Sequence, residues 1–260
     1  MTKPSRKTVY ADAGIQYDEL WPRDQKVAWN RAHSRLLRPI LAGAKSVCEL
    51  GCGTGNRACE FARRGLRVYA VDLSAAMLWA ARLKARRANL PIHFMQADMR
   101  SFRLPQRVDL INSEWGAVNH IPRKTDLLRV ARAVSRALRP GGYFVFDVNH
   151  RRVFDEIWAE TDIRETSKLF MVQRGGYDQR RGKGWLEVTW FVPGRRRGWK
   201  RFHQRIEETH WSGTEILRTL RESGFEHVQV FDFAVLVSNS RVPLTIRGYK
   251  SVFLARRTRD

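Results

Sequence analysis

The chain has 260 residues, and its apolar fraction of 43% is sufficient for one large α/β domain that carries an insertion. No apolar run approaches the roughly 20 residues that cross a bilayer, and the first twenty residues lack the hydrophobic centre of a secretory signal, so we expect a cytoplasmic protein. The net charge of +22 suggests nucleic-acid binding. Lysines and arginines are nevertheless spread along the whole chain, and only residues 195–201 form a concentrated basic patch, so the charge does not decide the substrate.

The first 40 residues are predicted to be a segment that covers the rest of the chain. Residues 1–14 are polar and expected to be loosely ordered. Over residues 24–41, Trp29, Leu36 and Ile40 recur at helical spacing and predict an amphipathic helix. This helix either packs over the core or serves as a lid that excludes water from a reacting group.

Residues 46–55, with the sequence SVCELGCGTG, predict a buried strand that ends in a glycine turn. Glycine permits positive φ and lets a ligand approach the backbone without meeting a Cβ atom. Residues 56–64 then have helical spacing. Strand, glycine turn and helix form the first unit of a nucleotide- or nucleoside-binding α/β fold. The G-x-G-x-x-A spacing from Gly53 to Ala58 also fits an NAD(P) site, so a dehydrogenase is an alternative at this point.

Carboxylates are predicted at the ends of the next two strands. Asp72 ends the strand at 67–71, where it is placed to accept both ribose hydroxyls of a nucleoside. Alternatively it caps the helix that follows, with Ser74 as the rival cap. The next strand, at 92–96, leads to Asp98. Further core elements are predicted as helices at 75–88 and 127–138 and strands at 108–112 and 143–148.

From residue 151 to residue 211 the pattern changes to that of antiparallel strands. Apolar residues alternate with others through Trp185 to Val192, and Pro193-Gly194 leads into a second strand. The S-x-x-E sequence at 212–215 is a capping box that opens the last helix. The strands of this half are predicted at 168–173, 185–192, 200–209, 227–233 and 250–255.

The glycine turn, with Glu49 directly before it, resembles motif I of the class I S-adenosylmethionine (SAM)-dependent methyltransferases. The sequence ALRPGG at 137–142, followed by YFVF, is similar to the turn that precedes strand five of that family. The resemblance covers roughly residues 40–150. It implies an α/β, Rossmann-like, seven-stranded mixed sheet with helices on both faces, an antiparallel strand seven and an antiparallel β subdomain inserted after strand five. The predicted divisions are a lid segment at 1–40, the SAM-binding core at 41–150, the inserted substrate-side subdomain at 151–211, and the last helix and strands at 212–260.

The resemblance further implies that SAM is the methyl donor and leaves S-adenosylhomocysteine as the product. The glycine turn passes the methionine part along the backbone, with Glu49 near its ammonium group. Asp72 holds the ribose, and Asp98 and Met99 hold the adenine. The complete predicted cofactor set is Glu49, Gly51, Cys52, Gly53, Thr54, Gly55, Asp72, Leu73, Met77, Asp98, Met99, Glu114 and Trp115.

A narrower resemblance concerns the methyl acceptor. The Tyr-Asp pair at 17–18, the VNHI sequence at 118–121 and the antiparallel insertion resemble small-molecule N-methyltransferases, namely the aminosugar N,N-dimethyltransferases and the glycine N-methyltransferase group. This implies that His120 and Tyr17 lie beside the substrate amine. An imidazole, with a pKa of about 6.5, can take a proton from an ammonium nucleophile. Each residue also has an ordinary structural interpretation, His120 as a loop cap and Tyr17 as a packing residue. Secondary candidates in the same region are His150, His203 and His210.

The predicted activity is methyl transfer from SAM to a small molecule, an amine, by in-line displacement. The arginines suggest a possible anionic acceptor. A nucleic-acid methyltransferase is the alternative, but the loop at 113–116 reads SEWG and lacks the (D/N)-P-P-(Y/F/W) motif of the adenine and cytosine N-methyltransferases. A third hypothesis is a non-catalytic nucleotide-binding protein. No membrane partner is expected, and the acceptor atom, the number of methyl transfers and the oligomeric state stay open.

Metal binding is not implied. The three cysteines, Cys48, Cys52 and Cys59, lie in or beside the glycine turn, and a zinc site needs a fourth ligand and a spacing that they do not have. An odd number of clustered cysteines indicates reduced thiols, as in a cytoplasm-like compartment.

Overall fold

The computed structural model describes residues 17–18, 23–194, 198–233 and 248–259. The N-terminal stretch that was expected to be loosely ordered, 1–14, lies outside the described residues. So does the centre of the basic patch, residues 195–197.

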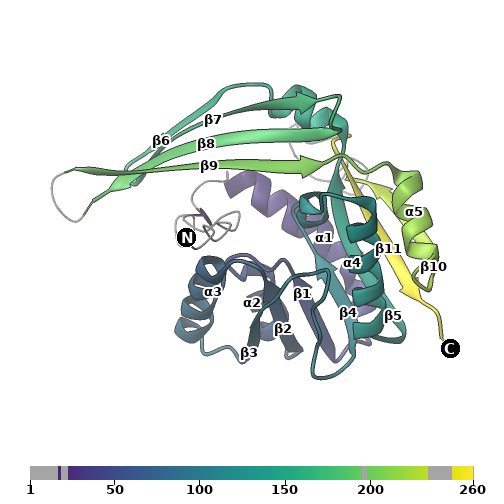
Figure 1. Cartoon of the computed structure of the whole chain (residues 1–260). Helices are drawn as coiled ribbons and strands as arrows, with labels where there is room; N and C mark the ends of the chain where they lie inside the picture. Colours follow the sequence, from purple (N-terminus) through teal and green to yellow (C-terminus); the bar gives the residue numbers. More distant parts are fainter. Residues whose placement is uncertain (1–16, 19–22, 195–197, 234–247, 260) are drawn as a thin grey trace, which may run out of the picture.

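Seven strands form one mixed sheet (Figure 1). They are β1 (Ser46–Leu50), β2 (Arg67–Asp72), β3 (Ile92–Gln96), β4 (Val108–Ser113), β5 (Leu138–Asn149), β10 (Phe225–Asp232) and β11 (Lys250–Arg257). Their order in space is β10-β11-β5-β4-β1-β2-β3. Strands β1 to β5 pair in parallel, whereas β11 runs antiparallel to both β5 and β10. The predicted Rossmann-like sheet with an antiparallel seventh strand is therefore confirmed.

Strand β5 begins earlier than the sequence predicted, at Leu138 instead of 143, so Pro140-Gly141-Gly142 lies within the strand and not in a turn before it. The pairing of β4 with β5 shifts register between Val108 and Leu110. A Cβ atom at Gly142 would lie 2.9 Å from the Arg139 carbonyl oxygen and 3.0 Å from that of Asp109. The irregular start of the strand therefore depends on glycine at this close approach.

Within the described part of the chain, five α-helices and two short helical turns lie between residues 23 and 221. They are α1 (Arg23–Leu41), α2 (Asn56–Arg63), α3 (Ala75–Arg87), the 3-10 helix η2 (Ala117–His120), α4 (Lys124–Ala137), the π-helical turn η3 (Val153–Ile157) and α5 (Gly213–Arg221). Of the two candidate caps for α3, Ser74 is the cap, because its hydroxyl accepts from the Met77 amide at 3.3 Å. The predicted capping box of α5 is present between Ser212 and Glu215.

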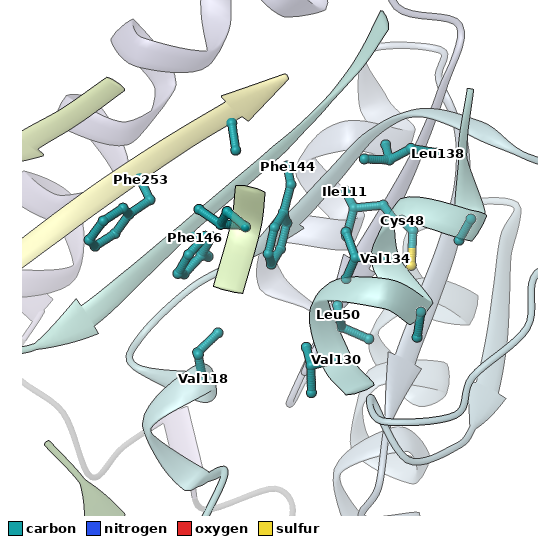
Figure 2. Packing of buried hydrophobic residues seen from close by; sticks show 14 of the residues in the cluster. Cys48, Leu50, Ile111, Val118, Val130, Val134, Leu138, Phe144, Phe146 and Phe253 are labelled. Carbon is teal, nitrogen blue, oxygen red and sulfur yellow. The ribbon is translucent and has the colours of Figure 1, made fainter. Parts of the chain in front are cut away.

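Apolar side chains cover both faces of the sheet, because parallel strands between two helical layers are buried on each side. Phe146 of β5 stacks with Phe144 and with Phe253 of β11, in the same buried cluster as Val130 and Val134 of α4 (Figure 2). Val145, between Phe144 and Phe146 in sequence, belongs to the cluster on the opposite face together with Phe61 of α2. Since helices occupy both faces, a ligand site is left at the edge where the parallel strands end.

A second, four-stranded antiparallel sheet follows β5 and extends across the top of the core in Figure 1. Its strands, in spatial order, are β6 (Asp162–Thr166), β7 (Leu169–Asp178), β8 (Lys183–Pro193) and β9 (Trp199–Thr209). The predicted alternation in β8 holds, since Leu186, Val188 and Trp190 are buried and their neighbours less so. Strand β6 was missed because its sequence, DIRET, is short, charged and without apolar alternation.

Candidate active site

The carboxyl ends of β1 to β4 border a cavity of about 760 Å³, a volume typical of small-molecule sites. The second sheet contributes Glu207 to its wall, and the N-terminal segment contributes Tyr17 and Asp18. Every residue of the predicted cofactor set lines this cavity except Gly55, and both predicted catalytic residues line it as well.

The glycine turn presents bare backbone to the cavity. Gly51 and Gly53 have φ values of +73° and +52°, in the left-handed region that favours glycine. The Gly51 and Cys52 amides donate to the Val71 carbonyl at 2.8 and 3.0 Å, which ties the turn to β2. A Cβ atom at Gly53 would meet nothing within 4 Å, so the space beside this backbone is open. The turn thus fits the approach of an extended ligand.

Gly55 has a different role from that of the other two glycines. It precedes α2 with φ +76°, and a Cβ atom there would lie 2.9 Å from the Cβ of Ala81 in α3. Gly55 therefore lets α2 and α3 pack closely instead of lining the cavity.

Asp72 joins the glycine turn to the end of β2. Its two carboxylate oxygens accept from the Gly53 and Ser74 amides, each at 2.8 Å. Burial raises the pKa of Asp72 even though these amide bonds oppose the shift. Because a carboxylate oxygen accepts more than one hydrogen bond, both oxygens keep capacity for a ligand hydroxyl.

The Asp98 carboxylate accepts hydrogen bonds from Arg100, a residue that the sequence did not indicate for this site. The Arg100 amide and Nε donate to Asp98 Oδ1 at 2.8 and 2.9 Å, and Nη2 donates to Oδ2. These hydrogen bonds hold the pKa of Asp98 below its ordinary value. An adenine amino group at this position would share the carboxylate with Arg100.

Two buried carboxylates lie behind the glycine turn and share one amide. Asn112 Nδ2 donates to Glu49 Oε2 and to Glu114 Oε1, both at 2.8 Å. Arg57 Nε and Trp29 Nε1 donate to Glu114 at 2.6 Å each. Although burial raises the pKa of Glu114, the Arg57 charge and these bonds lower it to about 2. Burial, together with the Glu114 charge, raises the pKa of Glu49 well above its ordinary value.

Glu114 therefore reaches the cavity wall with its carboxylate already bound by protein donors. Arg57, which pairs with it, is an arginine of α2 that is only 7% exposed. The sequence offers one signal for Arg57, because this arginine stands at the start of a helix whose following residues are largely apolar. The position of Glu114 indicates that it anchors α1 and α2 to the end of β4.

The N-terminal segment is tied to the glycine turn by Asp18. Thr54 Oγ1 and Asn56 Nδ2 donate to Asp18 Oδ1 at 2.7 and 2.9 Å, and Lys84 Nζ donates to Oδ2 at 2.7 Å. Burial raises the pKa of Asp18, but these bonds and the lysine charge leave it lowered overall. Tyr17, beside it, packs against the buried cluster of the second sheet.

His120 is the last residue of η2 and stands between the core and β9. Its Nε2 lies 3.8 Å from Oε1 of the buried Glu208, and the ring hydrogen-bonds to the Glu207 backbone. Burial lowers the pKa of His120 to about 4 against the effect of that bond. The imidazole is thus neutral near pH 7.

The three secondary histidines lie away from the described cavity. His150 Nε2 is 2.7 Å from Ser251 Oγ, and His203 Nδ1 is 2.9 Å from Thr189 Oγ1. His210 packs edge-on against Tyr177.

The cysteines of the glycine region are all free and buried. Across the described ranges, no three histidine, cysteine or carboxylate side chains form a potential metal site. None of the helices described is long and apolar enough to cross a membrane.

The strand order, the glycine turn and the strand-end carboxylates together define a Rossmann-like fold of the class I methyltransferase kind. Residues 47–142 match a family model described as a methyltransferase domain. This match and the likeness in fold agree with the resemblance recognised from the sequence.

Three relatives extend this comparison. A SAM-dependent methyltransferase from Clostridium acetobutylicum ATCC 824 matches with a TM-score of 0.78 at 20% identity, over 94% of this chain and 98% of that one. SAM-bound CalS10, an amino pentose methyltransferase from Micromonospora echinaspora, matches with a TM-score of 0.69 at 25% identity, over 94% and 95%. The ubiquinone biosynthesis O-methyltransferase of Serratia proteamaculans (strain 568) is 30% identical over 153 residues, which are 56% of this chain and 61% of that protein. The chain thus spans about three fifths of the length of the curated relatives it matches.

Proposed function

We propose that the chain is a SAM-dependent methyltransferase whose acceptor is an amine nitrogen of a small molecule. The observation that carries this proposal is a cavity that joins two kinds of wall. One wall is the glycine turn with Asp72 and Asp98, and the other is His120 with Tyr17 and the end of β9. The likeness to CalS10 over nearly the whole of both chains supports the same assignment.

The residues present fit SAM, because the open space beside Gly53 admits a ligand along the backbone. Gly51 and Gly53 would hold the methionine part, Asp72 the ribose and Asp98 the adenine. Bound SAM supplies an electrophilic methyl group on a sulfonium. Glu49, whose pKa is raised by burial, would ionise beside the ligand's ammonium group.

The acceptor nitrogen has to react as a free amine with its lone pair in line with the methyl carbon. The protein's contribution is to hold that alignment, to exclude water and to take the proton, for which His120 is placed. Alignment alone can supply roughly 7–11 kcal/mol of the barrier. A modest base such as this imidazole is therefore sufficient.

An amine is favoured over the anionic acceptor that the arginines suggested. The arginines described in the cavity wall, Arg57 and Arg100, are each paired with a carboxylate. On β9, Glu207 pairs with Arg181 at 3.1 Å and Lys183 at 3.7 Å. An anionic group would thus find its potential partners already engaged.

Calorimetric titration with SAM and S-adenosylhomocysteine tests the donor half of the proposal. A screen of metabolite pools with methyl-labelled SAM, read by mass spectrometry, tests the acceptor half. We expect label on an amine nitrogen and no transfer to RNA. Preferential binding of NAD, or label found solely on oxygen as the ubiquinone relative would suggest, would contradict the proposal.

A further inference from the structure

Glu208 is a buried carboxylate that the second sheet places behind His120. It lies on β9 and is only 4% exposed. Its Oε2 accepts from Asn149 Nδ2 at 2.7 Å, and its Oε1 lies 3.8 Å from His120 Nε2. Because burying a carboxylate with few partners is costly, a carboxylate kept in this position calls for an explanation.

The position of Glu208 relative to His120 is fixed by hydrogen bonds from a neighbouring asparagine. Asn119 Nδ2 donates to the Thr209 carbonyl at 2.9 Å and to the Asn149 carbonyl at 3.2 Å. In return the Asn149 amide donates to Asn119 Oδ1 at 2.9 Å. These bonds join η2, β5 and β9, so the ring and the carboxylate come from elements that are held in one arrangement.

A glycine is also required at this junction. Gly116 has φ +71°, and a Cβ atom there would lie 2.8 Å from Asn149 Nδ2, the group that donates to Glu208. The close approach of the loop after β4 to the end of β5 thus leaves Asn149 free to point at the carboxylate.

We propose that Glu208 is a positioning residue for methyl transfer: it orients the His120 ring and stabilises the imidazolium that forms when His120 takes the acceptor's proton. This inference rests on the proposed function. In the balanced step, the nitrogen lone pair forms the new N–C bond, and the C–S electron pair stays on sulfur. The proton released by the nitrogen adds to His120 Nδ1, the ring nitrogen that does not face Glu208, and the Glu208 carboxylate beside Nε2 faces the new positive charge.

Three ionisable groups surround the Glu208 carboxylate: His120 from η2, Asp147 from β5 and Lys250 from β11. Burial raises the pKa of Glu208 to about 7, Asp147 adds to the increase, and Lys250 opposes it. Below that pH, Glu208 is neutral and cannot stabilise an imidazolium, whereas above it the carboxylate is available. The contribution of Glu208 to kcat, through the imidazolium of His120, should therefore increase as the pH rises through about 7.

The test compares kcat of the wild type with that of Glu208→Gln from about pH 6 to about pH 8, on the amine found by the screen. The acceptor's own titration cancels in the ratio of the two rates. We expect Glu208→Gln to lower kcat roughly tenfold at the alkaline end and much less at the acid end. SAM affinity should stay within about twofold of the wild type.

Glu187→Gln is the matched control, because Glu187 is a carboxylate of the same sheet that pairs with Arg174 and Arg205 at the surface. It should leave the ratio unchanged. In a His120→Gln background, the Glu208 substitution should add little, since the two groups act as a unit. A rate ratio that does not vary with pH, or an equal loss in both backgrounds, would overturn the inference.

Glu208→Asp provides a second route if the glutamine variant does not fold. It keeps the charge but withdraws it from His120, so kcat should fall while the pH dependence persists. Unchanged kcat in this variant would also overturn the inference. By contrast, a wild type that binds SAM but methylates no amine would remove the proposed function itself.

Discussion

The two walls of the cavity are built in different ways. The wall proposed to hold the cofactor, the cofactor wall, comes from consecutive strand ends of the core, where the Gly53 amide donates to the Asp72 carboxylate at 2.8 Å. The wall proposed to face the acceptor, the acceptor wall, comes from segments far apart in sequence, where Tyr17, His120 and Glu207 line the same space. The first wall depends on local backbone geometry, and the second depends on how the inserted sheet packs on the core. Substitutions should therefore affect donor binding and acceptor chemistry separately.

The largest effect should follow the loss of the buried pair that supports the cofactor wall. Arg57→Met removes the arginine partner of the buried Glu114 carboxylate, which should cost about 3–5 kcal/mol of unfolding free energy. Chemical denaturation followed by circular dichroism measures it. Arg63→Met is the control, because Arg63 is an exposed arginine of the same helix. An equal, small loss in both variants would show that the Arg57–Glu114 pair is not a support of this wall.

The stability contribution of Glu114 should also depend on pH in a defined direction. Its pKa is lowered from 4.5 to about 2 in the folded protein, so the unfolded chain binds the proton more readily. The stabilisation is present above pH 4.5 and is lost as the pH falls towards 2. Arg57→Met should remove most of this acid-side slope, which the same denaturation experiment would detect.

The second largest effect should separate the acceptor wall from the cofactor wall. His120→Gln removes the proposed proton acceptor and should lower kcat about 10²-fold, the low end for general bases, because alignment supplies much of the catalysis. SAM affinity measured by calorimetry should change little. A parallel loss of SAM binding would indicate that His120 supports the structure and not the proton transfer.

The cofactor wall was more accessible from the sequence than the acceptor wall. Gly51, Gly53 and Asp72 follow directly from a strand, a glycine turn and a strand end, which are local patterns. Arg100 and Arg57 were missed, because the sequence does not reveal which partner an arginine will find after folding. Gly55 fits the motif, yet it lies at a helix–helix contact.

On the acceptor wall, resemblance selected His120 and Tyr17, but no pattern selected Glu208. Successive side chains of a strand point to opposite faces, so Glu208 lies behind His120, whereas the Glu207 carboxylate pairs with Arg181 and Lys183 on the other face of the sheet. Which of the two faces the ring depends on how the inserted sheet sits on the core. The charged strand β6 escaped prediction for a related reason, because an exposed edge strand needs no apolar pattern.

A smaller effect should come from adding one methyl group to the glycine turn. Gly53→Ala adds a Cβ atom that meets no protein atom but occupies the open space beside the backbone. Overpacking of about 1–3 kcal/mol against the ligand corresponds to roughly 5- to 150-fold weaker SAM binding. Gly65→Ala is a close control, since Gly65 has φ +79°, has open space at its Cβ position and lies outside the cavity wall. Equal SAM affinity in the two variants would argue against the turn as the binding surface.

The smallest effect should be a linkage between SAM binding and the proton on Glu49. Burial and the Glu114 charge raise the pKa of Glu49, so the native state holds this proton above the ordinary value of 4.5. As the pH rises from 4.5 towards the raised pKa, ionisation of Glu49 is therefore less favourable in the folded protein than in the unfolded chain. An arriving ammonium group would favour the ionised form, so binding should release part of a proton, and affinity should rise by at most about tenfold per pH unit. Calorimetry in two buffers of different ionisation enthalpy measures the released protons.

The variants Glu49→Gln and Glu187→Gln test the source of these protons. Glu49→Gln should abolish the proton release, whereas Glu187→Gln should retain it. Proton release that persists in Glu49→Gln would assign the linkage to another group.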